Sequence, residues 1–206
     1  MTPVTGDQTE RTRETGVGWG EANLPAGFPP PGPVDEIVIK QYPAYRAAIK
    51  LADSPGGGEQ NEMFWPLFQH IKKHDIAMTA PVEMTYETPQ ASTSDEVSPR
   101  IRAMAFMYAK PDMGTPGPDD AVVVTDLPAM TVLSIGVRGS YSNEHFQMAL
   151  TQLQNWMLEN PGRLTQSGSP RYLGYNSPFV PWFLRYGEVQ LPVTVVEPGQ
   201  VQRRSE

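Results

Sequence analysis

The sequence contains no cysteine among its 206 residues. Without thiols the chain can form no disulfide framework, no thiolate metal site and no cysteine nucleophile. A chain of this length buries roughly 70% of its unfolded surface when it folds, so it needs neither a disulfide nor a metal for stability. The absence excludes these roles but leaves secretion open.

The sequence also lacks an excess of basic residues and any long apolar run. Its 16 Lys and Arg against 23 Asp and Glu give a net charge of −7, which argues against a nucleic-acid partner, because a phosphate backbone requires a basic face. No apolar run approaches the roughly 20 residues of a membrane span. Residues 1–20 contain no apolar signal-peptide core. We therefore predict a soluble protein without a membrane span, cytoplasmic if Met1 is the native start.

No catalytic constellation is visible. No serine lies in a G-x-S-x-G elbow, and no glycine cluster has the lysine and hydroxyl of a phosphate-binding loop. His70 and His74 have the i, i+4 spacing of a metal site, but no glutamate intervenes as in a zinc hydrolase, and Lys72 and Lys73 would repel a cation. We predict neither an enzyme nor a metal site, and interpret the two histidines as polar residues closing a helix.

The length fits one ordinary domain with polar ends. Residues 1–33 are polar and then rich in glycine and proline, so they cannot bury enough apolar area to offset their ordering entropy. We interpret them as an extended or disordered lead-in. The folded domain is expected over residues 34–197, followed by a polar tail at residues 198–206.

Alternating apolar residues and β-branched runs predict the strands. The expected strands cover residues 37–39, 45–51, 78–86, 101–108, 122–124, 130–137, 171–175 and 186–193. In the third of these, Met78, Met84 and the other even-numbered residues share one face. Pro81 donates no ladder hydrogen bond, which places its strand at an edge, near a bulge or just past its start. Residues 88–99 and 110–120 are expected to be loops.

Two helices are predicted. The first opens at Asn61 with an apolar stripe of Phe64, Leu67, Phe68 and Ile71. Because Pro66 is tolerated only near a helix start, its first regular turn is expected around Phe64 or Trp65. The second helix is expected to begin at an N-cap, Ser142, and to stop at residues 160–162, a proline–glycine terminator.

This order of elements is strand-strand-helix-strand-strand, followed by much the same again, although the two halves do not match by residue identity. Two such units related by a pseudo-twofold would form one sheet. We predict an α+β fold with a mostly antiparallel curved sheet or open barrel and two helices packed against it.

Four segments in order resemble the SOUL haem-binding protein family. The most specific is Ile76-Ala77-Met78-Thr79-Ala80-Pro81-Val82; the others are residues 41–46, residues 138–142 and the C-terminal stretch within residues 175–189. Together they cover roughly residues 35–196. The resemblance implies the same barrel-like α+β fold and a SOUL-like haem-binding domain over residues 34–197.

The resemblance also implies tetrapyrrole binding in a shallow apolar groove beside the first helix. Met63, Phe64 and Phe68 are the expected wall, with Met78 nearby, whereas core packing is the better interpretation of Leu67. Lys72 or Lys73 would reach a haem propionate. His74 or His70 is the local candidate for an axial haem ligand, and binding of haem without axial ligation is the alternative.

Two functions stay open. The first is a non-catalytic carrier, buffer or sensor of haem or a related tetrapyrrole. The second is an effector-binding or protein-interaction module on the same scaffold, with a non-haem apolar small molecule or a protein as partner. Asn61 and Gln69 stand where some family members carry basic residues, and no histidine precedes His70; both observations favour the non-haem module. The intact signature favours the haem carrier, buffer or sensor.

Overall fold

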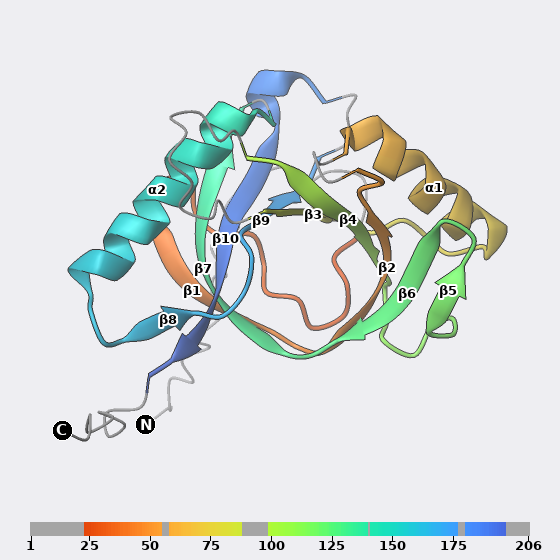
Figure 1. Ribbon diagram of the computed structural model, residues 1–206, viewed down its shortest axis with the longest axis horizontal. Coiled ribbons are helices and arrows are strands. Elements are labelled where there is room, and N and C mark those ends of the chain that lie inside the picture. The colour runs from red at the N-terminus through yellow and green to blue at the C-terminus, as the bar shows by residue number, and fades with distance from the viewer. Residues whose placement is uncertain (1–22, 55–57, 88–98, 140, 177–179, 197–206) are drawn as a thin grey trace, which may run out of the picture.

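The computed structural model describes residues 23–54, 58–87, 99–139, 141–176 and 180–196. Within these ranges the chain forms one antiparallel, curved, ten-stranded sheet that does not close, with two long helices on its outer side (Figure 1). The predicted α+β curved-sheet fold is therefore confirmed. Neither long helix in the described ranges is sufficiently apolar over a membrane-spanning length to cross a bilayer.

Most strands lie where the sequence pattern places them. The strands are β1 Ile37–Tyr42, β2 Tyr45–Leu51, β3 Val82–Tyr86, β4 Ile101–Met107, β5 Gly117–Asp119, β6 Val122–Leu127, β7 Met130–Arg138, β8 Leu164–Gln166, β9 Arg171–Gly174 and β10 Tyr186–Val195. The helices are α1 Gln60–Lys73, α2 Asn143–Glu159 and the short 3-10 helix η1 Trp182–Leu184. Both β5 and β8 were missed, because three residues are too few to show an alternation; β5 lies inside the predicted loop 110–120.

The sheet order demonstrates the two-half organisation. The strands follow one another as β1-β7-β10-β9-β3-β4-β2-β6-β5, with β8 paired to β10. Apart from the added edge strand β5, the order is the same from either end: β1, β7, β10 and β9 correspond to β6, β2, β4 and β3. Each half therefore places its first strand at the outer edge of the other half, and the pseudo-twofold passes between β9 and β3.

Helix α1 begins at Gln60, one residue before the predicted opening at Asn61. Its regular turns start about one turn earlier than the predicted Phe64 or Trp65, so that Pro66 lies inside the helix. An interior proline costs a helix about 3 kcal/mol, because it has no N–H to donate and its ring crowds the preceding turn. Here Met63 and Leu67 are buried on either side of the proline and hold both turns on the sheet. The carbonyl freed by the proline belongs to Glu62, an exposed residue where water can bind it. Tertiary packing thus overrides the local preference.

Helix α2 starts and stops as predicted. The Ser142 hydroxyl oxygen accepts a hydrogen bond of 3.2 Å from the backbone N–H of His145, and Asn160 is the C-cap ahead of the proline and glycine. The buried stripe consists of Phe146, Ala149, Leu150 and Leu153. Phe146 stacks on Tyr86 of β3 with 3.8 Å between ring centroids, which joins the second helix to the centre of the sheet.

The strand predicted from residue 78 starts later. Strand β3 begins only at Val82, directly after Pro81, whose peptide bond with Ala80 is cis. The preceding segment makes its hydrogen bonds elsewhere: the Ala80 backbone N–H donates to Asn23 O at 3.1 Å, and the Thr79 side-chain hydroxyl donates to Met107 O at 2.7 Å. Since Pro81 cannot donate to a ladder, regular pairing begins only after it. The edge position considered for this strand is wrong, because β3 lies between β4 and β9.

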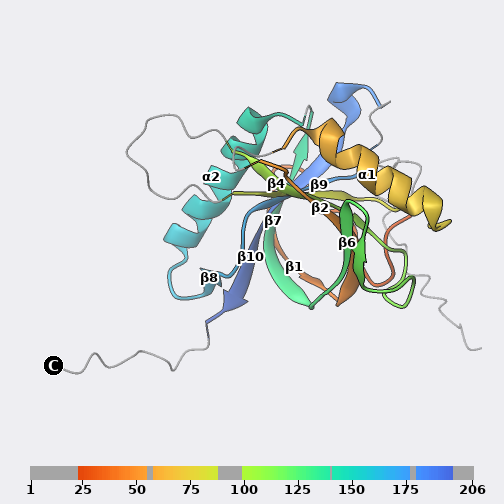
Figure 2. The same ribbon diagram turned by 45° about the vertical axis from the view of Figure 1, so that its right-hand side comes forward.

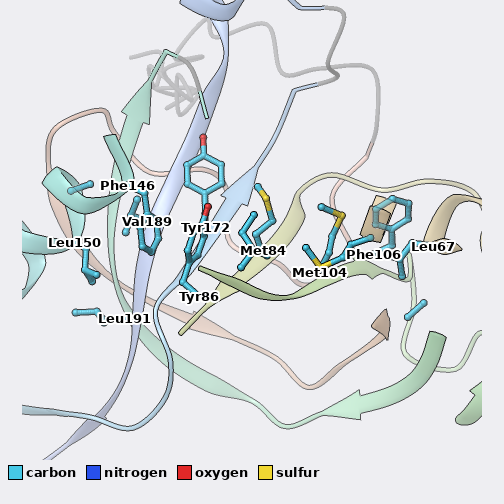
Figure 3. Packing of buried hydrophobic residues seen from close by; sticks show 14 of the residues in the cluster. Leu67, Met84, Tyr86, Met104, Phe106, Phe146, Leu150, Tyr172, Val189 and Leu191 are labelled. Carbon is cyan, nitrogen blue, oxygen red and sulfur yellow. The ribbon is translucent and has the colours of Figure 1, made fainter. Parts of the chain in front are cut away.

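Both helices pack on the same face of the sheet. Side chains from α1, α2 and the sheet strands between them form one hydrophobic cluster. Figure 3 shows it as a row of side chains extending from Phe146 and Leu150 of α2 across Tyr86, Met84 and the β4 residues to Leu67 of α1. In Figures 1 and 2 the helices stand at opposite ends of this outer side, so each covers one half of the sheet.

The inner face of the sheet is covered by residues 23–34, which we call the N-terminal strap. Phe28 packs edge-on against Tyr42 and Tyr45, with ring centroids 4.9 and 5.1 Å apart. Val34 then forms a bridge with Gly136 of β7. The strap therefore lies along the inside of the curve (Figure 1). The rest of the predicted lead-in, residues 1–22, and the polar tail lie outside the described residues.

Candidate functional site

One side of α1 carries aromatic rings that the sheet does not fully cover. Phe64 and Phe68 are half-buried and stack with 5.9 Å between centroids, and Trp65, 57% exposed, meets both edge-on. Phe64 also contacts Phe106 of β4 at 5.2 Å, which anchors the group to the core. Lys72 places its Nζ 5.2 Å from the Phe68 ring centroid. We call Phe64, Trp65, Phe68 and Lys72 the aromatic face of α1.

The aromatic face combines flat apolar surface with one exposed cation. An ammonium over an exposed ring gains only about 0.5–1 kcal/mol, so Lys72 can exchange that contact for a carboxylate at little cost. The rings themselves are fixed by their mutual stacking and by Phe106. The arrangement is suited to a planar apolar ligand with an acidic edge.

The other predicted wall residues lie in different environments. Met63 is 1% exposed and Leu67 is completely buried; both belong to the cluster beneath α1, where they hold the helix on the sheet. For Leu67 this is the expected core role. Met78 is 38% exposed and lies in the connection between α1 and β3.

His70 and His74 lie on the opposite side of α1 from the aromatic face. Each is two positions beyond a residue of that face, Phe68 or Lys72, which corresponds to about 200° around the helix. The His70 imidazole is buried, with Nε2 2.7 Å from Tyr108 Oη and Nδ1 2.7 Å from Asp119 Oδ2. His74 Nε2 is 2.8 Å from the same carboxylate oxygen. The structure therefore does not bring either histidine to a ligand on the aromatic face.

Asp119, the last residue of β5, is the centre of this polar group. Lys73 donates to Asp119 Oδ1 at 2.8 Å and to Asp120 Oδ2 at 2.9 Å. Lys73, and after it His74 and His70, hold the pKa of the Asp119 carboxyl well below its usual value. A pocket of about 230 Å³ opens beside the group, between the α1 residues Pro66, Gln69, His70 and Lys73 and the hairpin residues 119–121.

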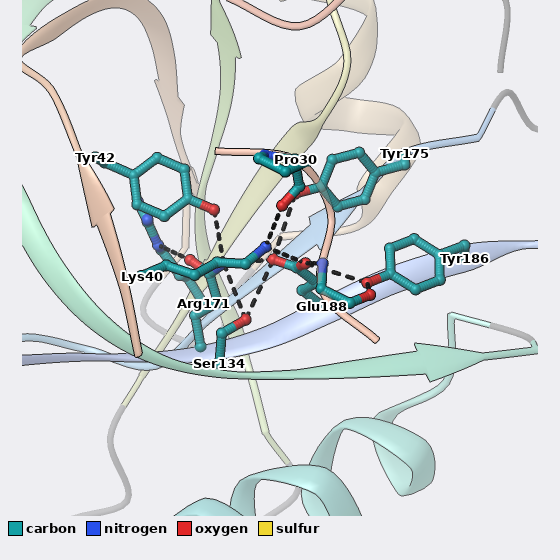
Figure 4. Close-up of polar contacts among 10 residues, drawn as sticks. Pro30, Lys40, Tyr42, Ser134, Arg171, Tyr175, Tyr186 and Glu188 are labelled. Atoms are coloured by element: carbon teal, nitrogen blue, oxygen red, sulfur yellow. Dashed lines mark hydrogen bonds and ion pairs between the residues drawn. The ribbon is translucent and has the colours of Figure 1, made fainter. Parts of the chain in front are cut away.

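A second polar group lies beneath the strap on the inner face, around the fully buried carboxylate of Glu188 (Figure 4). Lys40 Nζ binds Glu188 Oε1 at 2.5 Å and Pro30 O at 2.8 Å, and its pKa is lowered by burial. Gln190 Nε2 and the Ser134 hydroxyl donate to the other carboxylate oxygen at 2.7 and 3.2 Å. The carboxylate also accepts from the Gly32 backbone N–H and from two tyrosine hydroxyls, Tyr175 and Tyr186.

The same face holds a second buried ion pair. Arg171 Nη1 donates to Glu83 Oε2 at 2.9 Å and to Tyr45 Oη at 3.1 Å, while its Nε donates to Gln190 Oε1 at 3.0 Å. Gln190 thus joins the two charged groups into one network. Within the part of the chain that the structure describes, Arg171 Nη2 is the buried side-chain polar atom without a partner.

The sequence patterns identified neither Asp119 nor Glu188. Asp119 lies 49 residues beyond His70, in a stretch dominated by glycine and proline. Glu188 alternates with Val189 and Leu191 in β10 and therefore resembles a solvent-facing strand residue. Only the β5–β6 hairpin and the strap, both tertiary features, bring these carboxylates into the two polar groups.

Comparison with solved structures shows the same fold in proteins of low sequence identity. The EcmrR chain of an EcmrR–DNA complex matches with a TM-score of 0.60 at 16% identity, over 78% of this chain and 58% of that chain. The EcmrR C-terminal domain gives a TM-score of 0.58 at 18% identity, over 78% of this chain and 98% of that one. An uncharacterized conserved protein from Listeria innocua gives 0.56 at 14% identity, over 79% and 94%.

Comparison with curated proteins found no match. The family model described as SOUL heme-binding protein, in contrast, matches residues 30–192, which include every strand from β1 to β9, both long helices and most of β10. The matched range contains the signature ahead of β3, the aromatic face of α1 and the strand that carries Glu188. The chain therefore belongs to the SOUL haem-binding protein family.

Proposed function

We propose that this protein binds haem or a related tetrapyrrole on the aromatic face of α1 and does no chemistry on it, as a carrier, buffer or sensor. Family membership supports tetrapyrrole binding in general. One observation supports the aromatic face as the location of the binding site: Phe64 and Phe68 form a half-buried stack beside Trp65, with Lys72 at its end. A porphyrin plane lies on the rings, and a propionate takes the Lys72 ammonium.

The energetics permit such binding without an iron ligand. Covering about 400 Å² of apolar macrocycle supplies on the order of 10 kcal/mol. Association costs at least about 4 kcal/mol of this gain, whereas micromolar affinity requires about 8 kcal/mol. The contact between Lys72 and a propionate supplies about 1 kcal/mol of the difference, so the expected dissociation constant is on the order of 10 μM. His70 and His74 lie on the other side of α1, so we propose binding without axial ligation by these histidines.

Hemin titration tests the proposal directly. The wild-type protein is expected to give a saturable one-to-one shift of the Soret band together with quenching of tryptophan fluorescence. Phe68→Asp places a charge under the bound ring and is expected to weaken binding by about tenfold or more, because it removes apolar contact and desolvates a carboxylate. Trp65→Phe is expected to retain most of the affinity and to lose much of the quenching.

Leu158→Asp is the matched control, because Leu158 is an apolar residue of α2 that is 77% exposed. Helix α2 stands at the opposite end of the outer side from α1 in both views (Figures 1 and 2). This variant is expected to bind hemin like the wild type. A folded Phe68→Asp variant that binds hemin undiminished would locate the site elsewhere. Non-saturable binding by the wild type would remove the haem proposal altogether.

A second candidate function is binding of a non-haem molecule to the inner face. It is favoured by the Glu188 carboxylate, which lies among Tyr42, Tyr175 and Tyr186. A ligand there would have to displace the strap, since Gly32 and Pro30 occupy the approach. Saturable binding of a non-haem apolar probe such as 1-anilinonaphthalene-8-sulfonate that persists in Phe68→Asp, and is lost when the strap is perturbed by Phe28→Asp, would favour this second location.

A further inference from the structure

The group opposite the aromatic face has the composition of a metal site. His70 Nδ1, His74 Nε2 and an Asp119 carboxylate oxygen all lie within 4.8 Å of one another. His70 lies in the last turn of α1, His74 is the C-cap residue of the same helix, and the carboxylate comes from the end of β5. The sequence interpretation set a metal site aside because no glutamate lies between the histidines and because two lysines would repel a cation; the hairpin supplies an acidic partner from elsewhere in the chain.

The distances are close to those of a coordinated ion. Asp119 Oδ2 lies 2.7 Å from His70 Nδ1 and 2.8 Å from His74 Nε2. Around zinc, with metal–ligand bonds of about 2.0–2.2 Å, tetrahedral ligand atoms stand about 3.3 Å apart. Asp119 Oδ2 would therefore need to move away from both nitrogens by roughly half an ångström, while the two nitrogens, which lie within 4.8 Å of each other, would adjust to about the same tetrahedral separation. Asp119 ends a three-residue edge strand that has a neighbour on one side only, so it can make this adjustment.

The group also has an outer shell. Ligating histidines in proteins almost always use the other ring nitrogen for a fixed hydrogen bond, which orients the ring and sets its tautomer. His70 has this bond: its Nε2 is 2.7 Å from Tyr108 Oη, and both side chains are buried. With Nδ1 on a metal, Nε2–H donates to the Tyr108 oxygen. The second Asp119 oxygen accepts a hydrogen bond from Lys73 in the metal-free protein.

We propose that His70, His74 and Asp119 form a binding site for a divalent first-row transition metal ion of the zinc class, independent of the tetrapyrrole site. Two imidazoles and one carboxylate select such ions over calcium and magnesium, which prefer oxygen ligands alone. The adjoining pocket of about 230 Å³ holds water for the fourth coordination position.

Lys73 is the charge that opposes a cation here. Its ammonium bridges Asp119 and Asp120, and its side chain is 51% exposed. When a metal binds, Lys73 can keep its bond to Asp120, which is 80% exposed, and move outward. Removing the lysine charge should therefore strengthen metal binding. If the cluster were only an ion-pair network, the same change would remove two ion pairs and create no metal affinity.

The test is titration of the metal-free full chain with Zn²⁺ by calorimetry, and with Co²⁺ by visible absorption, which reports four-coordinate geometry. Wild type is expected to bind one ion. His74→Ala and Asp119→Asn should each weaken binding by at least the roughly 10–100-fold that outer-shell changes cost. Tyr108→Phe should weaken it about tenfold, and Lys73→Gln should strengthen it several-fold.

His145→Ala is the matched control, because it removes the third histidine, an exposed residue of α2, and leaves the cluster intact. It should bind Zn²⁺ like the wild type. Equal affinity of wild type and His74→Ala, or equal losses in His74→Ala and His145→Ala, would overturn the proposal. Hemin titration of His74→Ala separates the two sites. Unchanged hemin binding together with lost Zn²⁺ binding supports both the tetrapyrrole site and the metal site. If the wild type fails to bind hemin, the tetrapyrrole proposal is lost, but the zinc result still tests the metal site.

Discussion

Replacing Lys40 with methionine is expected to destabilise the protein by about 3–5 kcal/mol near neutral pH, the usual cost of removing one partner from a buried ion pair. Methionine fills a similar volume, so the loss reflects charge. Glu188 would be left fully buried with neutral donors only, from Gln190, Ser134 and two tyrosines. These donors place the expected loss toward the lower end of the range. Urea unfolding followed by circular dichroism gives the free energy directly.

Lys50→Met is the matched control. Lys50 is also a strand lysine that is 8% exposed, but its partner Asp53 has a side chain that is 80% exposed and returns to water when the lysine is removed. The expected loss is therefore about 1 kcal/mol or less. Adding Glu188→Gln to Lys40→Met should recover part of the stability, because a buried amide needs no counter-charge. Equal losses for Lys40→Met and Lys50→Met would contradict this account of the inner face.

The fold was largely predictable because its signals are local. Alternation gives the long strands, and the Ser142 cap with its proline–glycine terminator gives both ends of α2. The errors occur where tertiary contacts decide the boundary. Pro66 lies inside α1 because buried neighbours hold the helix on both sides, and β3 starts at Val82 because the backbone before it bonds to the strap and to β4.

The site was predictable only in part, for the same reason. Phe64 and Phe68 belong to one local helical stripe, and the structure brings them together in a half-exposed stack. Leu67 is buried as predicted, whereas the depth of Met63 depends on how α1 is rotated on the sheet, which no local pattern fixes. Asp119 contacts His70 only because the β5–β6 hairpin places it beside α1. The sequence pattern therefore indicated the two histidines but not the carboxylate that lies with them.

The two sides of α1 suggest a division of roles along one element. The aromatic face carries flat apolar surface, and the opposite side carries two imidazoles facing a carboxylate. Because the buried side chains of Met63 and Leu67 anchor α1 to the sheet, occupation of one side need not move the other. This independence is the reason that hemin and zinc titrations of the same variants can separate the two proposals.

Stability is expected to fall steeply above pH 10. Burial raises the pKa of Tyr86 to about 12, and burial together with the Glu188 carboxylate raises the pKa of Tyr42 to about 12. Tyrosine in the unfolded chain ionises near pH 10. Between these values the unfolded chain loses protons that the folded protein keeps, so each tyrosine lowers the free energy of unfolding by about 1.4 kcal/mol per pH unit. Below pH 10 both are protonated in either state and contribute no slope.

Tyrosine-to-phenylalanine variants separate the two contributions when urea unfolding is measured from about pH 9 to 12. Tyr86→Phe keeps the stack on Phe146 and removes the ionisable hydroxyl, so it should match the wild type in slope below pH 10 and have a shallower slope above it. Tyr42→Phe also removes the acceptor of a 2.9 Å hydrogen bond from Gln190. Its free energy of unfolding should therefore be lower by about 0.5–1.5 kcal/mol at every pH. An unchanged alkaline slope in Tyr86→Phe would mean that this hydroxyl ionises in the folded protein, and that the centre of the sheet admits water where Figure 3 shows packed side chains.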